Sequence, residues 1–181
     1  MTLEEVYREH FRFVWRVLRR LGVPESDVQD ATQDVFLVVH RKLAEFEGRS
    51  QLRTWLFSIC LGVARNRRRK PHHRYEVAGA MELDEHADAS ADQDAQAQRR
   101  QGLALLESLL EQIDLDQRVV FTLFELEGMT GEEMAEMLGI PLGTVYSRLR
   151  QGREAFRQAH TRARAAERFL ELRPQRHGGT P

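Results

Sequence analysis

Between residues 144 and 153 the sequence places a run of side chains that can bind DNA. Arginine can bond bidentately to guanine and glutamine to adenine, and serine or threonine hydroxyls can bind phosphate oxygens. At helical spacing these polar side chains lie opposite an apolar face made by Val145, Leu149 and Phe156. The outward-facing residues are Thr144, Tyr146, Ser147, Arg148, Arg150, Gln151 and Arg153. This pattern favours a helix that enters the major groove. The alternative is a helical hairpin with a solvated arginine face.

The residues before this face predict the elements that would position it. Thr130 and Glu133 have the spacing of a capping box, in which each side chain satisfies a backbone amide of the other residue. The short helix that they open is followed by Gly139, which can supply a left-handed turn residue, and by Pro141, which opens the next helix. A short helix, a tight turn and a long basic helix together predict a helix-turn-helix.

Two further clusters in the first 70 residues could also bind partners. A predicted helix over about 51–69 ends in a dense basic patch that suits phosphate binding: Arg65, Arg67, Arg68, Arg69 and Lys70. The preceding predicted helix, from Pro24 to about Phe46, carries a stripe at i, i+3, i+4, i+7 and i+11 away from its apolar side: Asp30, Gln33, Asp34, Leu37 and Arg41. This stripe is either idle surface or an interface for a partner helix. Trp55 could act as a wedge in melted DNA, but its place beside the buried stripe favours a core position.

Apolar residues recur at helical spacing in both halves of the chain, and no half shows strand-like alternation. The sequence therefore predicts an all-α protein with two small helical domains joined by a flexible acidic linker. We place the first domain at 1–70, the linker at 71–100, the second domain at 101–160 and a basic C-terminal tail at 161–181. The linker is assigned because its Ala, Asp, Glu and Gln offer too little apolar surface to offset chain entropy.

The charge distribution agrees with two anion-binding modules on a tether. Residues 1–75 hold 15 Lys and Arg against 9 Asp and Glu, and residues 118–181 hold 10 against 8. The intervening residues 76–117 hold 2 against 11, so an acidic middle separates two basic ends and the net charge is only −1.

Other functional classes find no support in the sequence. There is no glycine-rich phosphate loop, no plausible Ser/His/Asp set and no metal-ligand cluster, so we expect neither an enzyme nor a cofactor. The single cysteine, Cys60, excludes an internal disulfide and is expected to be a packed apolar thiol. The longest apolar run has only five residues and the N-terminus has no signal-peptide pattern, so we expect a cytoplasmic protein without membrane insertion.

Both halves resemble the RNA polymerase sigma factors of the extracytoplasmic-function type. EGMT at 127–130 and EMAEMLGIPLGTVYSRL at 133–149 resemble region four, which in that family binds the minus-thirty-five promoter element. DVQDATQDVF at 27–36 resembles the part of region two that docks on the polymerase clamp. FEGRS at 46–50 and TWL at 54–56 resemble the segment that meets the minus-ten element. Two independent matches in the right order are stronger evidence than one helix-turn-helix.

The resemblance implies a promoter-recognition subunit with polymerase core, promoter DNA and an anti-sigma factor as partners. It assigns the stripe on the second helix to polymerase, and it adds Arg49 and Ser50 to Arg65, Arg67 and Arg68 as DNA-binding residues of the first domain. The chain departs from many relatives at Gly62, where they have Asn, and at Tyr146 and Gln151, where they often have Arg. The rival interpretations are a free-standing helix-turn-helix regulator and a helical interaction protein.

Overall fold

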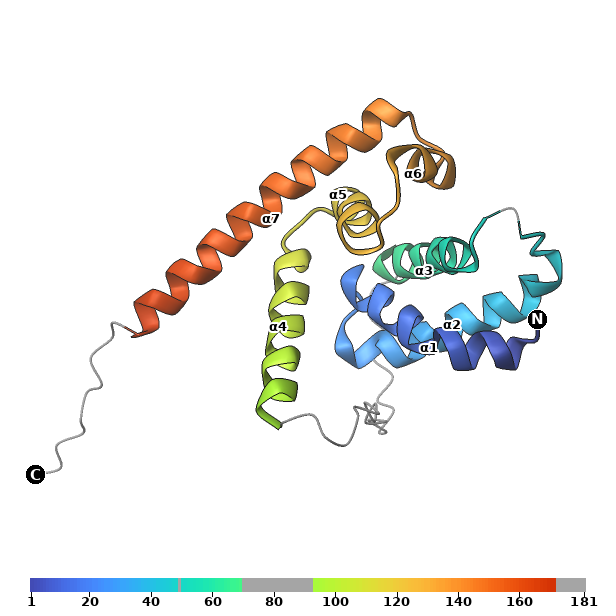
Figure 1. Cartoon of the computed structure of the whole chain (residues 1–181), viewed down its shortest axis with the longest axis horizontal. Helices are drawn as coiled ribbons and strands as arrows, with labels where there is room; N and C mark the ends of the chain where they lie inside the picture. The colour runs from blue at the N-terminus through green and yellow to red at the C-terminus, as the bar shows by residue number, and fades with distance from the viewer. Residues whose placement is uncertain (49, 70–92, 172–181) are drawn as a thin grey trace, which may run out of the picture. The chain divides into compact units, whose positions relative to one another are not determined.

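A computed structural model describes residues 1–48, 50–69 and 93–171, and every regular element in these ranges is a helix (Figure 1). The all-α fold class predicted from the sequence is therefore confirmed. Contacts divide the chain into two compact units, residues 1–111 and residues 112–181. Residues 71–92 of the predicted linker and 172–181 of the predicted tail lie outside the described residues.

The first unit is built on three helices, α1 Leu3–Arg20, α2 Glu25–Lys42 and α3 Leu52–Arg69, which all pack against one another. A capping box between Thr2 and Glu5 starts α1, with the Glu5 carboxylate accepting from the Thr2 amide at 2.7 Å. Each helix buries one apolar face. The shared core includes Val14, Val17, Leu18, Val28, Val35, Val39, Leu56 and Cys60. Cys60, which the sequence predicts to be a packed apolar thiol, is part of this core.

The second helix ends earlier than its apolar pattern predicts. The pattern continues to about Phe46, but α2 ends at Lys42 and a 3-10 turn, η1 Leu43–Glu45, follows. The Phe46 amide donates to the Leu43 carbonyl at 3.2 Å, which is the i to i+3 bond that tightens a terminal turn. The chain leaves the helix at Phe46 in an extended conformation.

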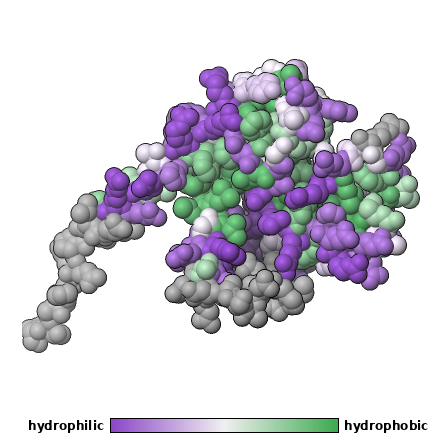
Figure 2. All heavy atoms as spheres, viewed as in Figure 1, coloured by the Kyte–Doolittle hydropathy of each residue, from purple (hydrophilic) through white to green (hydrophobic). Residues whose placement is uncertain are grey.

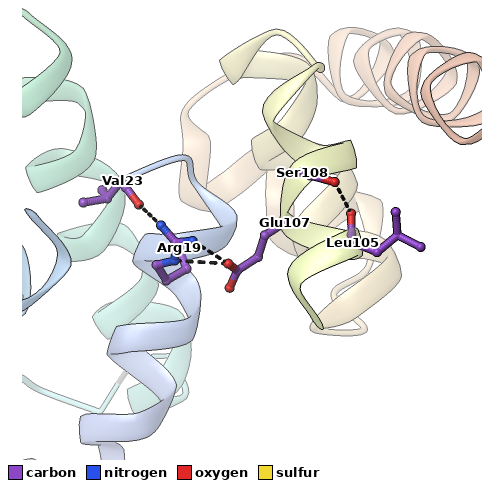
Figure 3. Close-up of polar contacts among 5 residues, drawn as sticks. All are labelled: Arg19, Val23, Leu105, Glu107 and Ser108. Atoms are coloured by element: carbon purple, nitrogen blue, oxygen red, sulfur yellow. Dashed lines mark hydrogen bonds and ion pairs between the residues drawn. The ribbon is translucent and has the colours of Figure 1, made fainter. Parts of the chain in front are cut away.

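A fourth helix, α4 Gln93–Glu111, completes the first unit and packs on α1 (Figure 3). Arg19 donates from Nε and Nη2 to Oε2 of Glu107 at 3.1 and 2.7 Å. Its Nη1 donates to the Val23 carbonyl at 3.0 Å, so the partly buried guanidinium has three hydrogen bonds. Residues 93–100, assigned to the linker from their composition, form the first turns of α4; alanine, glutamine and arginine are good helix formers.

The second unit contains α5 Leu115–Phe121, a π-helical turn η2 Thr122–Leu126, α6 Gly131–Leu138 and α7 Leu142–Glu171. The long helix α7 packs along α5, where the rings of Phe121 and Phe156 stack with their centroids 5.0 Å apart. An ideal Cβ at Gly152 would lie 3.1 Å from the Gln117 carbonyl oxygen. The absence of a side chain at Gly152 thus lets α7 approach the α5 backbone closely.

The core of the second unit includes a buried arginine. Arg118 is only 1% exposed, and its Nη2 donates to the Ile113 carbonyl at 2.9 Å. A buried charge is costly unless it is hydrogen-bonded. Arg118 therefore ties the start of α5 to the residues that precede it, in a core that includes apolar side chains such as Val120, Leu123 and Met134.

Candidate nucleic-acid interface

The turn between α6 and α7 has the geometry that the sequence predicted. Thr130 Oγ1 accepts from the Glu133 amide at 3.3 Å, and the Glu133 carboxylate accepts from the Thr130 amide at 2.8 Å. Gly139 ends α6 in the left-handed region, with φ of 64°, and the Ile140 amide then bonds the Ala135 carbonyl at 3.2 Å. The capping box and the glycine turn are thus confirmed, and together they set α7 across α6 as a helix-turn-helix.

Two of the predicted DNA-contacting arginines of α7 are bound by carboxylates of the same unit. Arg148 Nη2 lies 2.8 Å from Asp116 Oδ2 at the start of α5. Arg153 Nε lies 2.7 Å from Glu125 Oε1, and its guanidinium stands 5.0 Å from the centre of the Phe124 ring. These pairs hold both side chains along the flanks of α7. Both pairs are at least partly exposed, and such ion pairs are weak, so a phosphate can replace either carboxylate at small cost.

The other predicted DNA-contacting side chains of α7 are exposed, except for a partly buried Thr144: Tyr146, Ser147, Arg150 and Gln151. Gln151 accepts a hydrogen bond from Gln117 Nε2 at 3.1 Å, so α5 also orients this residue. Arg150 is the exposed guanidinium one turn after Tyr146. The face of α7 therefore has two parts. Tyr146, Ser147 and Arg150 are exposed, whereas Arg148, Gln151 and Arg153 contact side chains of α5 and η2.

Tyr146 lies against the first residue of α6. An ideal Cβ at Gly131 would be 2.7 Å from Oη and 2.8 Å from Cζ of Tyr146, closer than real Cβ atoms approach. The absence of a side chain at Gly131 thus leaves room for the ring, and the same Cβ would also lie 3.1 Å from Cδ1 of Leu142. Tyr146 is 48% exposed, so half of the side chain remains available to a ligand.

On α2, the predicted partner stripe is entirely exposed: Asp30, Gln33, Asp34, Leu37 and Arg41. Leu37 is 51% exposed although the opposite side of α2 is fully buried. It lines a shallow groove between α2 and α3, together with Val38 and Val63. The groove measures about 220 Å³, below the usual size of a cofactor or ligand pocket, and suits one or two protruding side chains of a partner.

An ion pair joins this stripe to the basic end of α3. Arg67 Nη2 lies 2.6 Å from Asp34 Oδ2, and both residues line the groove. Arg67 Nε also donates to the same oxygen at 3.2 Å. The structure therefore brings residues predicted for two different partners into a single surface of the first unit.

The other predicted DNA-contacting residues of the first unit lie in or just before α3. Ser50, Arg65 and Arg68 are exposed, whereas Arg49 lies outside the described residues. Trp55 is partly buried, and its ring packs against Phe46 with centroids 5.1 Å apart. Trp55 is therefore a contact at the rim of the core.

Sequence reasoning missed the acidic side chains that bind the arginines. On sequence grounds, Asp116 and Glu125 have no role beyond their contribution to the net charge. In the structure each forms an ion pair with a predicted DNA-contacting residue. They come from other elements, 32 and 28 residues before Arg148 and Arg153. Periodicity within one helix carries no signal for such a pair.

The described residues also show the state of the single cysteine and whether a metal site or a membrane-spanning helix is present among them. Cys60 is fully buried, as predicted, and burial raises the pKa of its thiol, which makes it a poor nucleophile. Within 1–48, 50–69 and 93–171, His, Cys, Asp and Glu form no group that could hold a metal ion. None of the helices in those ranges combines the length and apolar character of a membrane span.

Comparison with known proteins matches both halves of the chain to one family. Residues 6–74 match sigma-70 region 2, and residues 103–156 match sigma-70 region 4. The RNA polymerase sigma factor NccH of Alcaligenes xylosoxydans xylosoxydans is 32% identical over 152 residues, covering 82% of this chain and 81% of the relative. The ECF RNA polymerase sigma-E factor of Escherichia coli K12 is 33% identical over 145 residues, covering 74% and 73%.

Solved structures agree with these sequence matches. CnrH, in a complex with the cytosolic domain of CnrY, superposes with a TM-score of 0.60 at 25% identity and covers 86% of this chain and 85% of its own. The sigma factor RpoE of Bartonella quintana, in complex with the anti-sigma factor NepR, has a TM-score of 0.62 and covers 87% and 96%. At 18% identity, RpoE supports the fold alone.

Proposed function

Because the chain belongs to the sigma-70 family and is an RNA polymerase sigma factor of the extracytoplasmic-function type, we propose that it directs polymerase core to promoters through two separate surfaces. One surface is the α2–α3 groove with the basic end of α3, and the other is the outer face of α7. The observation that carries the proposal is the order of the two family matches, each on its own set of helices.

In this proposal the stripe on α2 binds polymerase. The groove beside Leu37 can accept an apolar side chain of a partner helix, while Asp30, Gln33 and Arg41 provide polar contacts around it. An apolar anchor surrounded by polar groups is the usual composition of a protein interface. The exposure of Leu37 supports this role, because burial of its side chain on binding would be favourable.

The basic end of α3 would then hold the opened promoter near the minus-ten element. Arg65 and Arg68 are exposed there, and Arg67 can exchange Asp34 for a phosphate. Ser50 and Arg49 precede α3 and would add contacts to unpaired bases. Capture of an unstacked base costs least where the duplex is already melted.

The helix-turn-helix would read the upstream, minus-thirty-five element. Residues near the start of a recognition helix point deepest into the major groove, so Tyr146 and Arg150, with Gln151, would contact bases. Arg148 and Arg153 flank the helix and would hold phosphates, in place of Asp116 and Glu125.

The two surfaces would act together because polymerase holds both on one promoter. Each contact alone is expected to be weak, and tethering raises the effective concentration of the second contact. The protein would work in the cytoplasm without catalysing a reaction, since nucleotide addition belongs to polymerase. We also propose an anti-sigma factor as a partner; RpoE was solved in complex with one, and CnrH in complex with the cytosolic domain of CnrY.

Run-off transcription on genomic DNA, followed by mapping of start sites, tests the proposal directly. We expect specific starts only when core enzyme and this protein are both present. A free-standing helix-turn-helix regulator would bind specific DNA without core enzyme and would initiate nothing. A helical interaction protein would give neither specific binding nor specific starts.

A further inference from the structure

The long helix α7 continues beyond the part of the chain that matches the family. The region 4 match ends at residue 156, whereas α7 runs to Glu171 as one uninterrupted helix of 30 residues (Figure 1). At 1.5 Å per residue the whole helix is about 45 Å long. Only Ala159 among residues 157–169 is fully buried, so this extension contributes little to the core of the second unit.

A single basic stripe runs along α7 from the proposed reading face into this extension. Its members follow one another at steps of three or four residues, and all are exposed: Tyr146, Arg150, Arg153, Arg157, His160, Arg164 and Arg168. At about 100° per residue they deviate from a common direction by no more than about 40°. The stripe extends over about 33 Å from Tyr146 to Arg168, on the same side of α7 as Tyr146 and Arg150.

The extension is basic overall. Residues 157–171 contain four arginines against two acidic residues, Glu167 and Glu171. Figure 2 shows mainly hydrophilic residues on the visible surface of α7 where it approaches the grey C-terminal residues. Within the described part of the chain, Arg157 pairs with Glu154 at 2.6 Å across one turn. That pair is exposed and therefore readily exchanged for another anion.

We propose that the outer half of the basic stripe, Arg157, His160, Arg164 and Arg168, binds the sugar–phosphate backbone of the duplex that flanks the upstream element. This inference rests on the proposed function, because it continues the same face of α7 past the bases that this face would read. A recognition helix contacts base edges with its N-terminal residues, and a straight helix cannot follow the curved groove over about 33 Å, so the outer half of the stripe leaves the groove beside a phosphate strand.

The chemistry of the stripe favours backbone over bases. Beyond Arg153 it offers cationic side chains and a histidine, without the glutamine, serine or threonine that accompany arginine at its start. Such a surface neutralises phosphates independently of sequence and releases counterions. The outermost arginines reach these phosphates when the duplex curves towards α7, a deformation that basic contacts can offset.

The chain provides a matched control for a test of this contact. Arg162 lies on the same helical extension but about 160° from the direction of the stripe, where it donates to Gln112 at 3.2 Å. The informative variant is Arg164→Ala combined with Arg168→Ala, and the control is Arg162→Ala. Alanine is a better helix former than arginine, and both stripe positions are exposed, so the helix should persist. Circular dichroism verifies this.

The experiment measures binding of the full-length protein, as holoenzyme, to promoter duplexes over a range of salt concentrations. One duplex extends about two helical turns, some 20 base pairs, upstream of the upstream element, and the other stops at its edge. On the long duplex the double variant should lower the slope of log affinity against log salt by about two units, close to 0.9 per phosphate contact. On the short duplex its slope should equal that of the wild type, and Arg162→Ala should match the wild type on both.

An unchanged slope on the long duplex would overturn the inference, and so would an equal reduction on both duplexes. A loss of affinity for core enzyme without DNA would assign the stripe to an acidic polymerase surface and would also overturn it. These outcomes are distinguishable from a failure of the proposed function, which would appear as the absence of specific transcription starts with wild-type holoenzyme.

Discussion

The two units hold their basic side chains in different ways. In the first unit Arg67, a proposed DNA contact, pairs with Asp34, a proposed polymerase contact, inside one groove. In the second unit two of the paired arginines, Arg148 and Arg153, bind carboxylates that belong to neither proposed interface. In the first unit an ion pair therefore joins the proposed polymerase-binding and DNA-binding residues. In the second unit the ion pairs position DNA-binding residues alone.

This difference predicts how substitutions will behave. In the first unit, a change at the groove should alter polymerase binding and DNA binding together, because the two sets of residues share an ion pair. In the second unit, sequence reading and phosphate binding should be separable, because Arg150 is exposed while the flanking arginines are held by α5 and η2.

The largest effect is expected for Gln33→Ala combined with Leu37→Ala. Removal of an apolar anchor and its polar neighbour should weaken core binding by at least about 2 kcal/mol, more than tenfold, as at interface hot spots. The fold should be unaffected, because both side chains are exposed. Affinity for core and the thermal midpoint are measured together, with Gln29→Ala, an exposed glutamine of α2 that does not line the groove, as control. Unchanged core affinity in the double variant would remove α2 from the polymerase interface.

The next effect separates the two kinds of arginine on α7. Arg150→Ala should cost about 1–3 kcal/mol at the preferred upstream sequence and change the order of preference. Arg153→Ala should weaken all sequences alike and lower the salt slope by about one unit. Transcription from a randomised upstream element at two salt concentrations measures both. If Arg150→Ala leaves the ranking of sequences intact, the base-reading face has been placed wrongly.

A smaller effect is expected at Gly131, through Tyr146. The methyl group of Gly131→Ala would meet the tip of the Tyr146 ring, which is half-exposed and can swing aside while the fold persists. The upstream preference should then change in the wild-type background but not in a Tyr146→Ala background. A double-mutant cycle should give a coupling of about 0.5–3 kcal/mol, as for residues in contact. Additive effects of the two substitutions would show that Gly131 does not position Tyr146.

The smallest effects compare the two acidic partners directly. Asp34→Asn and Asp116→Asn each remove one charge from an exposed or partly exposed ion pair, so each should lower the free energy of unfolding by less than about 1 kcal/mol. Asp34→Asn should change both core affinity and DNA affinity, whereas Asp116→Asn should change only DNA affinity. Equal behaviour of the two variants in the core-binding measurement would contradict the proposed difference between the units.

Local features of the chain follow from short stretches of its sequence. The capping box of Thr130 and Glu133, the left-handed Gly139 and the buried faces of α1 and α3 each depend on residues within a few positions of one another. Helix ends are less predictable: α2 stops at Lys42, and α4 begins at Gln93 within residues whose composition indicates a linker. Composition does not report the packing that stabilises α4 on α1.

The sequence by itself determined the all-helical class, the helix-turn-helix and the polar stripe of α2, because helical periodicity is a property of neighbouring residues. Only the tertiary structure decided which charges meet. Arg19 binds Glu107 across 88 residues, Arg67 binds Asp34 across 33, and Arg148 binds Asp116 across 32. Such pairs depend on how whole helices pack, and the packing is governed by the summed burial of many apolar side chains on their inner faces.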